Sequence, residues 1–136
     1  MILKHVIGVW RSPEYTAHKL QKSAGTSTTA SYVEAPRNPM TLDVTQQYGC
    51  SFFDLNTWSN GEIGGAEHVI GVFHADHSSF TILELREDFE GGTTAIITGS
   101  HDGEVIHFSY AGTSADGLAG MVFNTDLVLV EAPSFD

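Results

Sequence analysis

The chain has 136 residues, a length typical of one domain, and its six Lys and Arg residues against 17 Asp and Glu residues give a formal net charge of −11. Such a surface repels phosphate groups and offers no basic stripe, so we expect neither nucleic acid nor an anionic membrane as a partner. The single cysteine, Cys50, forms no intrachain disulfide, and no zinc-finger spacing of Cys and His occurs, so we expect no metal and no cofactor.

Residues 1–10 form an apolar segment that is interrupted by Lys4 and His5, and no small-residue cleavage site follows it. This pattern predicts a first strand rather than a signal peptide. No apolar run in the chain is long enough to cross a bilayer as a helix. We therefore expect a soluble, cytoplasmic protein.

Residues 11–38 carry the weakest pattern of the chain. The segment 14–22 fits either a short helix or another strand, and 23–30 is rich in Ser, Thr and Gly, which predicts a mobile loop. Pro36 and Pro39 stop regular structure before the next strand. We interpret 11–38 as a long first connection that acts as a lid over an open end of the domain.

From residue 40 onward, short runs of alternating apolar and polar residues are separated by turn signals. Period-two alternation is typical of half-buried strands. Asp102-Gly103 is a clear hairpin turn, because this pair readily adopts the positive φ angles of primed turns. The predicted strands cover 40–47, 50–58, 66–73, 80–86, 93–98, 104–110 and 118–130.

Together with residues 1–10, these runs make eight consecutive strands. An open sheet of hairpins would expose two unpaired edges, whereas closure removes both. Eight strands enclose an interior that side chains fill or that holds one small ligand. The sequence therefore predicts an all-β fold, an eight-stranded antiparallel up-and-down β-barrel that covers 1–136 as a single domain, with a β-sandwich as the alternative.

The triplet Gly8-Val9-Trp10, followed by this succession of hairpins, resembles the calycin group: the lipocalins, fatty-acid-binding proteins and avidins. The resemblance implies an eight-stranded barrel with a ligand cavity, in which Trp10 plugs one end. Two features depart from it. Residues 118–136 contain no basic residue of the kind that lies over this Trp in lipocalins, and the biotin-site pattern of avidins is absent. A shared fold does not by itself transfer an activity.

Four titratable residues on predicted strands are candidates for acid–base catalysis: His68, His107, Glu84 and Asp126. An imidazole that points into a barrel can transfer a proton near neutral pH, whereas one that points outward is ordinary surface, and we favour the outward orientation for both histidines. Asp126 stands in an otherwise apolar final strand, which makes it a candidate for the interior.

Glu84 belongs to a strand with apolar residues on both faces. If Leu83 and Leu85 face the core, then Glu84 is solvated together with Arg86, and we favour this arrangement. If Phe80 and Ile82 face the core instead, Glu84 enters the barrel, where a buried carboxylate is costly and becomes a functional candidate.

The turn at 74–79 contains His74, Asp76 and His77, which are residue types that bind divalent metals. Turn polarity is the simpler explanation of this cluster, and we assign no metal ligands there.

Aromatic residues on the predicted strands are expected to line the core and an apolar ligand cavity. The candidate ligand-binding residues are Trp10, Phe53, Trp58, Phe73, Phe108, Tyr110 and Phe123. The final strand, 118–130, is apolar on both faces, and because one face of a barrel strand looks outward, we expect a homodimer.

Three functions stay open, in this order of preference. The first is binding of a small, largely hydrophobic molecule in the barrel. The second is a cofactor-free isomerase or cyclase that positions a hydrophobic metabolite and moves a proton. The third is an assembly subunit with a filled core.

Overall fold

The computed structural model of the chain describes residues 6–22, 30–59, 61–62, 64–85, 94–113 and 119–131, apart from the side chains of Asp54 and Thr94. These residues form strands and turns and contain no helix, so none of them forms a helix that spans a membrane. The strands are β1 (Gly8–Arg11), β2 (Tyr15–Lys22), β3 (Ala30–Arg37), β4 (Thr41–Tyr48), β5 (Ser51–Ser59), β6 (Gly64–Phe73), β7 (Ser79–Leu85), β8 (Thr94–His101), β9 (Val105–Thr113) and β10 (Ala119–Glu131).

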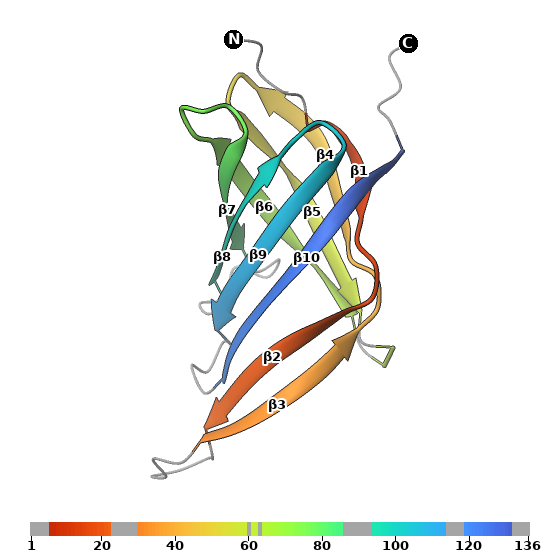
Figure 1. Cartoon of the computed structure of the whole chain (residues 1–136), viewed down its shortest axis with the longest axis vertical. Helices are drawn as coiled ribbons and strands as arrows, with labels where there is room; N and C mark the ends of the chain where they lie inside the picture. Colours follow the sequence, from red (N-terminus) through yellow and green to blue (C-terminus); the bar gives the residue numbers. More distant parts are fainter. Residues whose placement is uncertain are drawn as a thin grey trace.

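Eight of these strands close into an antiparallel barrel. The strands from β4 to β10 pair in chain order, and β1 pairs with β4 on one side and with β10 on the other. Trp10, for example, lies opposite Leu42 on β4 and Leu129 on β10. The all-β, eight-stranded up-and-down barrel that the alternation predicts is therefore confirmed (Figure 1).

The remaining two strands, β2 and β3, form a hairpin that extends beyond the barrel (Figure 1). β1 pairs with the C-terminal part of β10, and β2 pairs with its N-terminal part, where His18 lies opposite Val122. The segment 14–22 is thus a strand, because its backbone satisfies the hydrogen-bonding groups of β10 that β1 does not reach. The long first connection at 11–38 therefore contains two strands, and the predicted loop at 23–30 lies outside the described residues except for Ala30.

One half of the barrel interior is filled by large side chains. Trp10 is fully buried, its indole Nε1 donates a hydrogen bond to the carbonyl oxygen of Val6 over 2.8 Å, and its ring meets His101 edge-on at 5.1 Å. Phe52 packs against Phe73 and Phe80 at ring separations of 5.3 and 6.1 Å. This end of the barrel is therefore closed by aromatic packing.

The outer surface carries exposed apolar side chains. Ile70, Leu83 and Ile96 are direct register partners on β6, β7 and β8, and all three are exposed. Val122 and Val128 are exposed on β10, as the doubly apolar final strand predicts. The homodimer expected from that strand stays a prediction.

The filled half of the barrel depends on the absence of a side chain at Gly99. A Cβ at this position collides with the carbonyl oxygen of His107 on the neighbouring strand. Gly99→Ala is therefore expected to lower the free energy of unfolding by about 2 kcal/mol, as overpacking of an interior does. Urea unfolding measures the change.

Gly120→Ala is the matched control, because a Cβ there meets no atom closer than the Gly112 carbonyl oxygen at 4.0 Å. Its free energy of unfolding is expected to stay within about 1 kcal/mol of the wild type. Equal losses for the two variants would contradict the close approach of β8 and β9 at Gly99.

Candidate functional site

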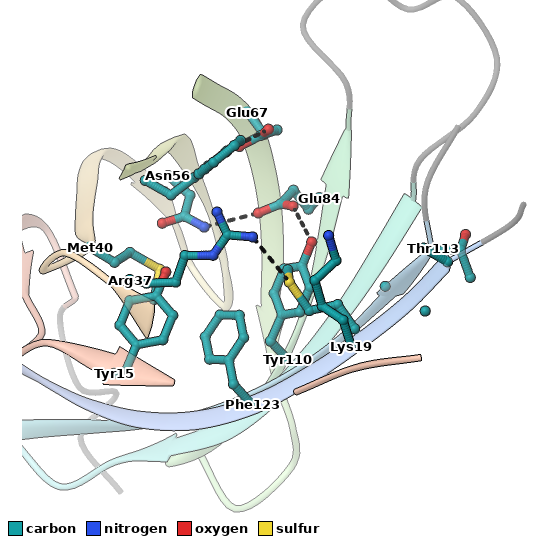
Figure 2. Close-up of a pocket in the computed structure, with 15 residues that line it drawn as sticks. Tyr15, Lys19, Arg37, Met40, Asn56, Glu67, Glu84, Tyr110, Thr113 and Phe123 are labelled. Carbon is teal, nitrogen blue, oxygen red and sulfur yellow. Dashed lines mark hydrogen bonds between the residues drawn. The ribbon is translucent and has the colours of Figure 1, made fainter. Parts of the chain in front are cut away.

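A cavity of about 250 Å³ lies between the barrel strands and the β2–β3 hairpin, both of which contribute lining residues. Its wall comes from β2, β3, β5, β6, β7, β9 and β10, with Met40 between β3 and β4 (Figure 2). Side chains that are far apart in the sequence therefore meet around one space. The residues of interest fall into a buried polar cluster, a set of aromatic rings and two cations.

The polar cluster is built on Glu84, which is 5 % exposed. The amide Nδ2 of Asn56 donates to one carboxyl oxygen of Glu84 over 2.9 Å, and the hydroxyl of Tyr110 donates to the other over 3.0 Å. The amide oxygen Oδ1 of Asn56 is buried and has no hydrogen-bond partner in the described part of the chain. The cluster therefore contains a buried, unsatisfied acceptor on a residue that lines the cavity.

The solvated position that we favoured for Glu84 is wrong. Phe80 and Ile82 are fully buried and Leu83 is exposed, so the alternation along β7 carries Glu84 into the barrel. The reason is tertiary: the large side chains of Phe80 and Ile82 fill the closed half of the interior, which fixes the inward face of the strand. Arg86 lies outside the described residues.

Burial raises the pKa of Glu84 above its ordinary value, and the nearby carboxyl of Glu67 adds to this rise. The hydrogen bonds from Asn56 and Tyr110 oppose the rise, because they stabilise the ionised form. Burial and the neighbouring Glu84 also raise the pKa of Tyr110. The site thus holds a carboxyl group with an increased tendency to keep its proton, next to a neutral phenol.

Three rings, which we call the aromatic wall, stand beside this cluster: Tyr15, Tyr110 and Phe123. Phe123 stacks on Tyr110 with 4.7 Å between ring centroids and tilts against Tyr15 at 4.6 Å. Burial raises the pKa of Tyr15 to about 12, against the opposing effect of the Arg37 charge, so the wall is uncharged. It provides a flat apolar surface of the kind that binds rings.

Trp58 and the cationic pair, Lys19 and Arg37, complete the site. The indole Nε1 of Trp58 donates to Glu67 Oε1 over 2.9 Å, and the guanidinium of Arg37 lies 4.9 Å from the centre of the Trp58 ring. Lys19 and Arg37 are half-buried and come from the hairpin strands β2 and β3. The hairpin therefore brings positive charge to a cavity whose barrel side carries carboxyl groups.

Of the four candidate acid–base residues, the cavity contains Glu84 and none of the others. His68 is exposed on β6, because its neighbour Val69 occupies the interior. His107 and Asp126 are exposed on β9 and β10, where Nδ1 of His107 lies 2.8 Å from Oδ1 of Asp126. The interior position that we proposed for Asp126 is therefore wrong, since Leu127 fills the barrel on that strand.

The candidate ligand-binding aromatic residues divide into three groups. Those that line the cavity are Trp58, Tyr110 and Phe123. Those buried outside the cavity lining are Trp10, Phe73 and Phe108. Phe53 is half-buried and stacks on the exposed Tyr48 at 5.7 Å, on the opposite face of β5 from the buried Phe52.

Sequence reasoning missed several cavity residues, of which Asn56 is the most informative. A signal for it exists, because Asn56 has the same parity on its strand as Phe52 and Trp58. A polar residue between two large aromatic residues on one face of a strand indicates a buried polar site. For Arg37 and Lys19 no such signal exists, since the hairpin that carries them was not predicted.

The turn at 74–79 is organised by hydrogen bonds to the carboxyl group of Asp76. Oδ1 of Asp76 accepts hydrogen bonds from the backbone amides of Ser78 and Ser79, and Oδ2 accepts one from the Ser79 hydroxyl. Together these bonds lower the pKa of Asp76 to about 2, and the bond from the Ser79 hydroxyl makes the largest contribution. Within the described ranges, no group of three or more His, Cys, Asp or Glu side chains is arranged to hold a metal ion.

Comparison with protein-family models, with curated proteins and with solved structures finds no match to this chain. The class that the fold defines is a closed antiparallel β-barrel, and the site is a cavity within it.

The raised pKa of Glu84 predicts a pH-dependent stability. Above about pH 4.5, the ordinary pKa of a glutamate, the unfolded chain releases a proton that the folded protein keeps until the pH passes its raised pKa. The wild type therefore loses stability in this window as pH rises. Glu84→Gln carries no such proton, so its stability relative to the wild type is expected to increase with pH.

Urea unfolding of both proteins from about pH 4.5 to about pH 8 measures this difference. Glu104→Gln, at an exposed position in the turn between β8 and β9, controls for the general removal of one negative charge. A difference between wild type and Glu84→Gln that is flat, or that falls with rising pH, contradicts a raised pKa for Glu84.

Proposed function

We propose that the protein binds a small, largely apolar molecule that presents a hydrogen-bond donor to the buried end of the cavity. The observation that carries this proposal is the unpartnered Oδ1 of Asn56, a residue that is 2 % exposed. An acceptor left unsatisfied in a protein interior costs roughly 1–3 kcal/mol. A ligand hydroxyl or amine that donates to this oxygen recovers that free energy.

The size of the cavity supports a ligand of about one ring with short substituents. A cavity of about 150 Å³ is known to hold benzene, and this cavity measures about 250 Å³. The aromatic wall offers stacking on one side, and Met40 and Met121 add deformable apolar surface. These groups favour a flat apolar body over an extended flexible chain.

The arrangement of the barrel also supports a distant relation to calycins, in which one end is plugged and the other receives a ligand. Gly8-Val9-Trp10 falls on β1, and Trp10 is buried in the closed half. An assembly role with a filled core has less support, because the interior beside the hairpin is hollow.

Binding of para-ethylphenol, which has one ring and one hydroxyl donor, tests the proposal. The wild type is expected to bind it in a saturable manner, and Asn56→Leu is expected to weaken binding by about tenfold or more, because the acceptor is lost. Isothermal titration calorimetry measures the affinity, and quenching of Trp58 fluorescence reports that the cavity is occupied. Thr57→Leu, on the outward face of the same strand, is the matched control and is expected to bind normally.

Absence of saturable binding by the wild type, or equal affinities for wild type and Asn56→Leu, contradicts the proposal. Native mass spectrometry of freshly purified protein complements the titration, since a natural ligand that co-purifies appears as added mass.

A second candidate function is a cofactor-free isomerase or cyclase, and Glu84 is the observation that favours it. Its carboxyl lines the cavity, is buried, and has a raised pKa, which suits a group that exchanges a proton with a bound molecule. The hydroxyl of Tyr110, 3.0 Å from Glu84, stabilises negative charge on the carboxyl after proton donation.

The enzyme hypothesis predicts that the protein accelerates exchange of the α-protons of cyclohexanone in heavy water, followed by proton NMR. Glu84→Gln is expected to reduce the acceleration by about 100-fold or more while para-ethylphenol still binds. Acceleration that is equal in wild type and Glu84→Gln, or absent in both, contradicts a catalytic role for Glu84.

A further inference from the structure

The cationic pair gives the cavity a positively charged side, on which the proposed function does not depend. The sequence contains six Lys and Arg residues in total. Four of them lie in the described part of the chain, namely Arg11, Lys19, Lys22 and Arg37, and two of these four line this one cavity (Figure 2). Half of the described Lys and Arg side chains thus meet at a single site, in a protein with a formal net charge of −11.

The cationic pair has no counter-ion within the described part of the chain. Arg37 contacts the ring of Trp58 and directs Nη2 towards Sδ of Met121 at 3.7 Å, and neither of these groups carries a negative charge. No described carboxylate lies at salt-bridge distance from Arg37 or from Lys19. Because a half-buried cation without a partner is unfavourable, an anion at this position gains more than it would at an exposed lysine.

The barrel side of the same cavity has the opposite character. Asn56 on β5 and Glu84 on β7 are hydrogen-bond acceptors, and both are far less exposed than the cationic pair on the hairpin. The aromatic wall lines the same space. A molecule that satisfies all of these surfaces has an anionic end towards the hairpin, a flat apolar body, and a donor towards the barrel.

We propose that the ligand is a small aromatic monocarboxylate with a hydroxyl group on the opposite side of its ring. The carboxylate is bound by Arg37 and Lys19, the ring by the aromatic wall, and the hydroxyl donates to Oδ1 of Asn56. This inference rests on the proposed function, because it names the chemical class of molecule that enters the same cavity.

A carboxylate fits better than other anions for two reasons. Its two oxygens match the planar fork of a guanidinium, which forms two parallel hydrogen bonds with a carboxylate. A dianionic phosphate meets stronger repulsion from the carboxyl groups of Glu67 and Glu84, which line the same cavity, and from the net charge of the protein. The cavity volume of about 250 Å³ limits the ligand to one ring with short substituents.

Three probes separate the two polar ends of such a ligand. Para-hydroxyphenylacetate has both the carboxylate and the hydroxyl, phenylacetate lacks the hydroxyl, and para-ethylphenol lacks the carboxylate. By isothermal titration calorimetry at low ionic strength, para-hydroxyphenylacetate is expected to bind the wild type about tenfold or more tightly than either of the other two.

Variants then assign the carboxylate to its binding residues. Arg37→Gln and Lys19→Gln are each expected to weaken binding of para-hydroxyphenylacetate by about tenfold, and to weaken binding of para-ethylphenol by a much smaller factor. Retained binding of the neutral probe also shows that each variant is folded. Lys22→Gln removes the same charge from an exposed position on β2 and is expected to change neither affinity. Arg37→Lys, which keeps the charge but not the fork, is expected to fall between Arg37→Gln and the wild type.

The outcomes distinguish this inference from the proposed function. If para-ethylphenol binds the wild type as tightly as para-hydroxyphenylacetate, or if Lys22→Gln weakens the carboxylate as much as Arg37→Gln does, the cationic pair only balances the carboxyl groups of the cavity. The inference is then overturned, whereas the proposed function stands. If none of the three probes binds the wild type, both are overturned.

Discussion

Closure of the sheet is the constraint on which the interior of this protein depends. Because β1 pairs with both β4 and β10, every side chain on the eight barrel strands points either into the barrel or away from it. On β7 this leaves no intermediate choice: with Phe80 and Ile82 inside, Glu84 is inside as well. A buried carboxyl is costly by itself, and hydrogen bonds from Asn56 and Tyr110 reduce that cost.

The two halves of the interior differ in how completely side chains fill them. In the closed half, Trp10 and Phe73 pack against the buried His101, and Phe73 packs against Phe52 and Phe80. In the other half, smaller and polar side chains on the same strands leave the cavity. The β2–β3 hairpin extends from this half and contributes part of the cavity wall. The proposed binding site thus lies at one end of a closed scaffold, which is a common arrangement in barrels.

Local charge in the cavity differs from the charge of the whole molecule. The net charge of −11 governs solubility and long-range association, whereas the cavity combines a carboxyl with a raised pKa and two cations from the hairpin. Burial has a different effect on each side of the cavity. It favours the neutral form of Glu84, and it strengthens the attraction between the cationic pair and any anion that displaces water from it. This polarity supports the proposed orientation of the ligand, with its anionic end towards the hairpin.

The sequence by itself determined the strands from residue 40 onward and the closed barrel, because alternation between turn residues is a local signal and eight consecutive strands need closure to remove their edges. It identified Glu84 as a candidate, but alternation says which residues share a face and not which face is inside, and β7 is apolar on both. Only the tertiary structure decided that Glu84 and Asn56 point inward. Pairing of the hairpin with β10, which lies near the other end of the sequence, brought Arg37 to them, since contacts between such distant segments leave no local pattern.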